Sequence, residues 1–431
     1  MRVEHRPPLL PLAASGCSPP RMNTRAPLLL LALAFVTLLL AACADKTPAP
    51  VPPPAVQAPP PLAAQDWRRP VFYYATNRNA LDVGPNGARY GGQRSREMSY
   101  GQLLVGATGG QADGSDLYRV NISLDRVTRM THSRAFSDIE RAAARTPGRE
   151  VLLFIHGFDN SFDDAAKTSA RIGVGIGFTG AMMLYSWPSA GSPASYLADR
   201  NNAYWAVQGL KDLLTDLTNS PWIGRVSVVV HSMGNEVLIR AYSELTGECA
   251  STRGGCGNLR KVRAIVLAAP DMDREIFLDQ YAAKLTHLDA RVVLYTSGGD
   301  MALTASALVQ GGDYERLGKN VLCIPGVQVT DVSDVKTDVL GHSWVSQSRA
   351  VLQDLRCSVT ENCNRYSTGL LQEMICPASM RYALPGVGNP ADRATNGASF
   401  WRLRVQQNGS STPTSAGFGF KMPSLPSFLG N

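Results

Sequence analysis

The fold class of this chain is indicated by the stretch Val226-Ser227-Val228-Val229-Val230-His231-Ser232-Met233-Gly234-Asn235. A run of β-branched residues leads directly into His-Ser-x-Gly, and a helix-compatible segment, 236–245, follows. This order predicts a buried strand, a tight turn that presents the Ser232 hydroxyl, and a helix whose first N–H groups face any negative charge formed there. The common pattern of such a nucleophile elbow is G-x-S-x-G, and Val230 replaces its first Gly. The alternative is that Ser232 only caps a helix behind a buried strand.

Strand-like and helix-like segments alternate from about residue 66 to residue 355. The segments 150–155 and 226–230 are almost continuously apolar, which is typical of strands in a parallel sheet. Further strands are expected at 71–76, 117–124, 181–187, 262–267 and 291–296, and helices at 135–144, 163–176, 201–217 and 345–355. This alternation predicts an α/β fold with a doubly wound, mostly parallel sheet and helices on both faces. In such sheets, functional residues collect at the carboxyl ends of the strands.

Three residues of complementary chemistry follow predicted strands or precede the last predicted helix, in the order Ser232, Asp300 and His342. A His can accept the proton of a Ser hydroxyl, while an Asp fixes the His tautomer and stabilises its cation. Chain order Ser, acid, His is the order of the α/β-hydrolase fold. We therefore predict Ser232 as nucleophile, His342 as base and Asp300 as acid.

Other carboxylates compete with Asp300 for the acid role. Asp271 and Asp273 follow the preceding predicted strand, from which some α/β-hydrolases take their acid. Asp334 and Asp338 are closer to His342 in sequence, but their loop position favours turn or capping roles.

A second strand end carries the expected donors for an oxyanion. His156-Gly157-Phe158 follows the strand 150–155 and resembles the oxyanion-hole loop of lipases and esterases. We expect the backbone N–H of Phe158 to face the nucleophile, with the N–H of Met233 as the second donor. Each such donor contributes on the order of 3–4 kcal/mol in the transition state. The imidazole of His156 is expected to be structural.

The N-terminus has the features of an export signal. Arg25 precedes an apolar run, 26–42, and Met22 is the expected start of translation. The run ends in Leu40-Ala41-Ala42-Cys43, which resembles a bacterial lipobox, so residues 1–43 are expected to be a leader and lipoprotein signal peptide. Acyl chains on Cys43 would anchor the protein in the bacterial cell envelope. Ala44 favours the outer membrane, with the domain facing the periplasm.

The remaining segments fit the same arrangement. Residues 44–64 are rich in Pro and are expected to form an extended tether, 65–355 the catalytic domain, and 356–431 a Cys-containing appendage with a disordered tail. Six cysteines follow Cys43, an even number that suits an oxidising compartment. Among the fifteen connectivities that six cysteines allow, sequence proximity favours Cys249–Cys256, Cys357–Cys363 and Cys323–Cys376.

Composition excludes several partners. The net charge is +7, and no basic run is interleaved with aromatic residues, so nucleic-acid binding is not expected. No C-x-x-C motif or His-rich cluster occurs, so neither a metal nor another cofactor is expected. The expected partners are a small-molecule or lipid ester and, through lipidated Cys43, a membrane.

Six motifs occur in an order that resembles a bacterial α/β-hydrolase family of unassigned biological role, broadly grouped with the esterase/lipase superfamily. They are Phe72-Tyr73-Tyr74-Ala75-Thr76-Asn77-Arg78, His156-Gly157-Phe158, Ser186-Trp187-Pro188-Ser189, His231-Ser232-Met233-Gly234-Asn235, Ala269-Pro270-Asp271-Met272-Asp273 and Gly341-His342-Ser343. The resemblance covers about residues 66–355 and implies the fold, the nucleophile Ser232 and the base His342. Its members often carry Asn where this chain has Asp159, and an inward carboxylate there would oppose an anionic intermediate.

These observations predict a membrane-anchored serine hydrolase, a carboxylesterase that forms an acyl-enzyme. Amide or thioester cleavage by the same residues is an alternative. A catalytically silent scaffolding lipoprotein is the other alternative, although such a protein has no need of the complete Ser, Asp and His set.

Overall fold

The computed structural model describes residues 62, 66–109, 120–252, 255–286, 290–312, 314–335, 338–360, 363–382 and 398–405. All of them belong to the second of two compact units, Ala58–Asn431. The expected leader with Cys43, nearly all of the tether and the tail beyond residue 405 lie outside the described residues. Among the helices within these ranges, none has the length and apolar character needed to cross a membrane.

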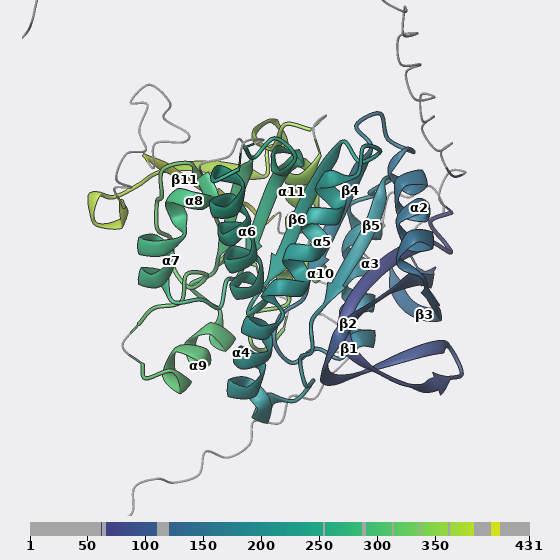
Figure 1. Cartoon of the computed structure of the whole chain (residues 1–431). Helices are drawn as coiled ribbons and strands as arrows, with labels where there is room; N and C mark the ends of the chain where they lie inside the picture. Colours follow the sequence, from purple (N-terminus) through teal and green to yellow (C-terminus); the bar gives the residue numbers. More distant parts are fainter. Residues whose placement is uncertain are drawn as a thin grey trace, which may run out of the picture. The chain divides into compact units, whose positions relative to one another are not determined.

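In the described part of the chain, one sheet of 11 strands forms the centre of the unit (Figure 1). Its order is β10-β11-β9-β8-β7-β6-β4-β5-β1-β2-β3. The strands are β1 Val71–Gly84, β2 Gly87–Thr108, β3 Asn121–Met130, β4 Glu150–Ile155, β5 Ala181–Ser186, β6 Arg225–His231, β7 Val262–Ala268, β8 Arg291–Thr296, β9 Val327–Asp331, β10 Leu371–Ile375 and β11 Ser399–Leu403. In this order, every pair of neighbours from β11 through β9 and β4 to β1 is parallel. The antiparallel pairs are at the two edges, where β10 joins β11 and where β2 joins β1 and β3.

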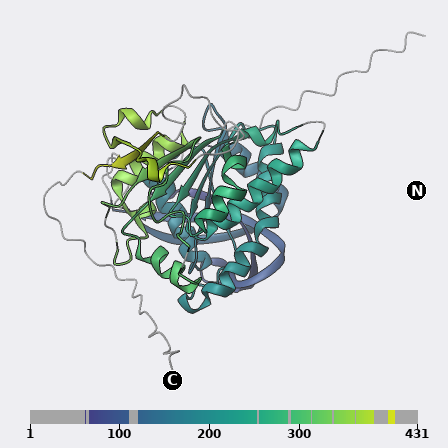
Figure 2. The same ribbon diagram turned by 90° about the vertical axis from the view of Figure 1, so that its left-hand side faces the viewer.

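Helices cover both faces of this sheet, as Figures 1 and 2 show. They are α2 His132–Ala143, α3 Phe162–Gly175, α4 Tyr196–Trp205, α5 Val207–Asn219, α6 Gly234–Ala250, α7 Arg274–Gln280, α8 Ala282–Thr286, α9 Met301–Val309, α10 Trp344–Gln347 and α11 Arg349–Val359. Alternate residues of a strand enter different cores: Leu153 of β4 packs with α2, α5 and α6, and Phe154 packs with α3, α10 and α11. The predicted doubly wound α/β architecture is confirmed.

The site is positioned by the point at which the strand order reverses. From β4 the chain continues to β5 on one side, whereas β6 lies on the other side of β4 and leads on to β7 and β8. The connections that leave the carboxyl ends of β4 and β6 therefore lead to opposite sides, and in α/β sheets functional residues gather at such a point. His156 follows β4, and Ser232 follows β6.

Several element boundaries differ from the expectations. The helix expected at 201–217 is two helices, α4 and α5, which meet at Ala206. The strand expected at 117–124 lies later, as β3, where it pairs with the long strand β2. Tertiary pairing rather than local apolar content defines these edge strands.

Described elements continue beyond residue 355, the expected end of the catalytic domain. Helix α11 continues to Val359, and β11 extends the central sheet by pairing in parallel with β9. Short edge strands of mixed composition have a weak signature in the sequence, because the neighbouring strand rather than their own pattern stabilises them. The three expected disulfides, Cys249–Cys256, Cys323–Cys376 and Cys357–Cys363, are confirmed.

Candidate active site

Ser232 occupies a strained turn directly after β6. Its φ angle is +51°, which is uncommon for a residue other than Gly, and its side chain is nearly buried. Backbone strain of this kind costs about 1–3 kcal/mol and persists only where surrounding contacts enforce it. Here the Ser232 N–H donates to the Ala268 carbonyl at 3.0 Å, and the Ser232 carbonyl accepts from the Asn235 side chain at 2.8 Å. The turn predicted at Ser232 is therefore present.

Two glycines allow the loop after β4 to touch this turn. A Cβ on Gly157 would lie 2.6 Å from the Cβ of Ser232, and a Cβ on Gly234 would lie 2.3 Å from the His156 carbonyl oxygen. Neither position has room for a side chain. Val230, by contrast, lies in the regular part of β6 with its side chain in the core. The turn tolerates Val230 because the backbone segments approach each other closely at Gly157 and Gly234 and not at residue 230.

His342 and Asp300 form a buried pair at the same edge of the sheet. The Asp300 side chain is fully buried, and its Oδ2 lies 2.6 Å from His342 Nδ1. Its other oxygen accepts the Leu303 N–H at 3.0 Å and so caps α9. Because the carboxylate accepts from Nδ1, the neutral ring presents Nε2 as a proton acceptor. Burial lowers the pKa of His342, but the charge and hydrogen bond of Asp300 outweigh this and raise it above 6.5.

The loop that carries His342 is fixed to the turn at Ser232. His231 Nε2 donates to the His342 carbonyl at 3.1 Å, and the two imidazole rings lie 4.6 Å apart. Burial and the neighbouring His342 lower the pKa of His231 to about 3, so its ring is neutral. Asp338 accepts the N–H groups of His342 and Ser343 at 3.2 and 2.9 Å, which is the capping role predicted for it. The positioning role of His231 was not anticipated from the sequence, although His231 stands beside Ser232 in the same motif.

The competing carboxylates have other partners. Asp273 caps α7 by accepting the Ile276 N–H at 3.0 Å. Asp271 accepts the Tyr196 hydroxyl at 2.9 Å and the Ser306 hydroxyl, and the guanidinium of Arg316 lies 3.7 Å away. Within the described residues, only Asp300 bonds to the His342 ring. The described residues contain no hydrogen bond between Ser232 Oγ and His342, and such bonds are often long before substrate binds.

The loop after β4 places backbone donors beside Ser232. Phe158 follows Gly157, which approaches the Ser232 side chain, and Met233 follows the serine, so both expected donors belong to backbone next to Ser232. In the described ranges neither N–H donates a hydrogen bond to the protein. The imidazole of His156 is buried and stacks on Trp187 at 5.0 Å. Burial, with Arg78 nearby, holds the pKa of His156 well below its ordinary value, so the ring is neutral and structural as expected.

Arg78 holds the loop after β4 in place through hydrogen bonds. Its buried guanidinium donates to the Asn160 carbonyl at 2.7 Å, the Ser189 carbonyl at 2.7 Å and the Ser186 hydroxyl at 2.8 Å. Burial lowers the pKa of Arg78 to about 9, although Asp199 opposes that shift. The motif 72–78 therefore acts by joining β1 to the loops after β4 and β5, a role that could not be assigned from the sequence.

A sequence comparison places this site in a family. The family described as "Alpha/beta hydrolase of unknown function (DUF900)" matches residues 132–358, a segment that includes Ser232, Asp300 and His342. The chain belongs to this family. No match was found among curated proteins.

Solved structures similar to this α/β hydrolase include other hydrolases at low identity. A Trichoderma reesei cutinase in complex with a phosphonate inhibitor is 14% identical, with 48% of this chain and 75% of that chain covered and a TM-score of 0.27. A predicted CIB-like hydrolase from Thermoplasma acidophilum is 12% identical, with 65% and 97% covered and a TM-score of 0.28. A hyperthermophilic esterase from Pyrobaculum calidifontis is 11% identical, with 65% and 84% covered and a TM-score of 0.28. Likeness this remote says nothing about the substrate.

Four large aromatic side chains near the sequence motifs have different positions in this hydrolase. Trp187 and Trp344 are fully buried in the core, and Tyr204 is 66% exposed on α4. Tyr196 packs edge-to-face on Phe158 at 5.2 Å and so adjoins the loop of the site.

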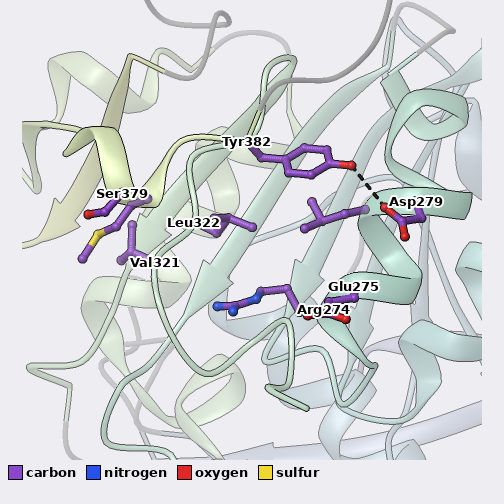
Figure 3. A pocket seen from close by; sticks show the side chains of 9 residues that line it. Arg274, Glu275, Asp279, Val321, Leu322, Ser379 and Tyr382 are labelled. Atoms are coloured by element: carbon purple, nitrogen blue, oxygen red, sulfur yellow. Dashed lines mark hydrogen bonds between the residues drawn. The ribbon is translucent and has the colours of Figure 1, made fainter. Parts of the chain in front are cut away.

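A separate hollow of about 350 Å³ lies between α7 and the disulfide-linked segment near the C-terminus. Figure 3 shows Tyr382 above this hollow, with its hydroxyl on Asp279 at 3.3 Å, and Arg274 and Glu275 below. Its walls include none of the residues that surround Ser232. This hollow is therefore separate from Ser232, Asp300 and His342.

Asp159 gives the site a testable pH dependence. Its φ angle is +55°, and burial with the charges of Asp199 and Asp164 raises its pKa to about 6. Asp159 directly follows Phe158, an expected oxyanion donor, so above pH 6 its charge would oppose an oxyanion at that donor, whereas below pH 6 the carboxylate is neutral. We expect Asp159→Asn to raise kcat/KM about three- to fivefold at pH 8, the size of a charge interaction of ~0.8 kcal/mol across solvated protein. At pH 5 the two enzymes should be equal.

The measurement is the ratio of kcat/KM between variant and wild type from pH 5 to pH 8. Asn also accepts a positive φ, so the loop should keep its shape. Asp163→Asn, which removes a charge from the exposed start of α3, serves as the matched control and should show a ratio near one. A ratio for Asp159→Asn that does not change with pH would rule out the charge effect.

Proposed function

We propose that this α/β hydrolase is a serine hydrolase that cleaves carboxylic esters through an acyl-enzyme. Ser232 is the nucleophile, His342 the general base and Asp300 the acid that orients it. The observation that carries the proposal is the 2.6 Å contact of Asp300 with His342 Nδ1, which leaves Nε2 as the acceptor in a loop bonded to the turn at Ser232.

The chemistry follows from these positions. Ser232 Oγ attacks the ester carbonyl carbon while its proton passes to His342 Nε2. The N–H groups of Phe158 and Met233 donate to the oxygen that becomes negative. Collapse of this intermediate breaks the bond to the alcohol, which leaves with the proton from His342. Water then attacks the acyl-enzyme with His342 again as base, which releases the carboxylic acid and restores Ser232.

The proposal extends to the location of the enzyme. The sequence ending in Cys43 supports a lipid anchor in the bacterial envelope, and the Pro-rich segment 44–64 supports a spacer between the anchor and the catalytic unit. Outer-membrane attachment with the catalytic unit in the periplasm is the arrangement we propose. The three disulfides suit an oxidising compartment of this kind.

A fluorophosphonate probe tests the proposed chemistry directly. The purified full chain should form one covalent adduct, which peptide mass spectrometry should place on Ser232. Turnover of a nitrophenyl ester and of the matching nitroanilide then separates ester from amide cleavage, and we expect the ester to be the better substrate by at least 100-fold. Absence of labelling would favour a silent scaffolding protein, and an adduct on another serine would reassign the nucleophile.

A further inference from the structure

Helix α9 buries Leu303 in the core and also exposes an apolar stripe to solvent. Its exposed side carries Met301, Ala305, Leu308 and Val309, with 52%, 71% and 55% of Met301, Leu308 and Val309 accessible. These positions recur at i, i+4, i+7 and i+8, so they form one stripe. No residue from 301 to 310 carries a charge. A surface helix of a soluble domain normally turns such a stripe toward the core.

The inward side of α9 is held in place by the buried side chain of Leu303 and by polar bonds. Ser306 donates to Asp271 and lies 2.7 Å from the Tyr196 hydroxyl, to which Gln310 also donates. Because these bonds are buried or partly buried, rotating the helix to hide its apolar stripe would remove the Ser306 hydroxyl from Asp271 and the Gln310 amide from Tyr196. The outward direction of the stripe is therefore built into the fold.

The apolar stripe begins at the proposed catalytic acid. Asp300 is the N-cap of α9, and the Met301 N–H donates to the Leu340 carbonyl at 2.9 Å. Val339, next to Leu340, is 97% exposed. Met301 and Val339 thus place apolar surface on the segments that hold Asp300 and His342.

Other exposed apolar side chains lie at the same edge of the sheet. Val83 lies in β1 beyond the residues that pair with β5, and Leu197 lies in α4, which follows β5. Figure 1 shows α4, α9 and the β1–β2 hairpin at one end of the sheet. Ile375 is an exception, because it pairs with Ser399 at the opposite, amino end.

We infer that α9 docks the carboxyl edge of the sheet on a lipid surface, so that the substrates are esters of lipids presented by a bilayer. This inference rests on the proposed function. An uncharged helix with an outward apolar stripe can enter the boundary between headgroups and acyl chains, where desolvation favours it. Docking there would bring an ester group to Ser232 while the acyl chain stays among apolar side chains. A small ester that is free in water has no need of such a surface.

Insertion can be measured without turnover. In the full chain carrying Ser232→Ala and Cys43→Ser, Leu308→Trp places a fluorophore on α9, and Ile375→Trp places one at the opposite end on a residue of similar exposure, 81%. The vesicles contain phosphatidylethanolamine and phosphatidylglycerol with brominated acyl chains, which quench tryptophan fluorescence. For Leu308→Trp we expect more quenching than in the parent chain and a blue shift of the emission. Ile375→Trp should match the parent chain. Equal quenching at both positions, or none at Leu308→Trp, would overturn the inference.

Turnover gives the second test. The variant Leu308→Gln with Val309→Gln should hydrolyse a short, water-soluble nitrophenyl ester at the wild-type rate and lose at least tenfold on phospholipid vesicles. Equal rates on vesicles, or equal loss on both substrates, would overturn lipid docking. A change from oligomer to monomer in light scattering, with unchanged vesicle turnover, would assign the stripe to contacts between copies. If wild type fails on the soluble ester as well, the proposed function fails, while the quenching experiment still decides the docking.

Discussion

Replacing Ser232 by Ala is expected to lower kcat for a soluble nitrophenyl ester by about 10⁶-fold, since loss of the nucleophile leaves only binding and the oxyanion donors. The residual rate should stay above that in buffer, because Phe158 and Met233 still offer their N–H groups. Binding of substrate should change little, since the proposed interaction of Oγ is made in the transition state.

The Ser232→Ala variant should keep its fold. The backbone bonds of residue 232 to Ala268 and Asn235 do not involve the hydroxyl. Circular dichroism and the thermal midpoint should therefore match wild type, and kcat is measured on enzyme shown to be folded. Ser133→Ala, which changes an exposed serine at the start of α2, is the matched control and should retain full activity. Retention of more than one per cent of kcat by Ser232→Ala would exclude Ser232 as the nucleophile.

Asp300→Asn is expected to lower kcat by about 10⁴-fold. The Asn amide can donate to His342 Nδ1, which places the ring proton on Nε2 and prevents it from accepting the serine proton. Asn is as good an N-cap as Asp, so α9 should keep its start and the fold should survive. The loss therefore measures orientation of the base and not unfolding.

The same variant should move the pH profile. In wild type, kcat/KM should rise with pH through an ionisation above 6.5, because protonated His342 cannot act as a base and Asp300 raises its pKa. Asp300→Asn removes the partner charge, so burial lowers the pKa and the remaining activity should rise at lower pH. Asp273→Asn changes only the cap of α7 and is the control, with unchanged kcat and profile expected. If Asp271→Asn gave the large loss while Asp300→Asn did not, the acid role would belong to Asp271.

Much of the fold could be predicted because its signals are local. The apolar run before Ser232 and the similar run before His156 identify two buried parallel strands, and the residues that follow them lie at the same edge in any parallel sheet. The strands β10 and β11 were not predicted. Each has only five residues of mixed apolar and polar character, and such a strand depends on its neighbour in the sheet for stability.

The sequence by itself determined the α/β architecture, the turn at Ser232, the loop at Gly157 and the order of the three site residues. All of these follow from short-range patterns of apolar residues, glycines and chain order. Tertiary structure decided which aspartate meets His342, because Asp271, Asp273 and Asp300 all follow strands, and only the packing of their side chains brings Asp300 alone among them to the His342 ring. It also decided the buried brace of Arg78 and the outward stripe of α9, since both depend on which distant groups receive their hydrogen bonds.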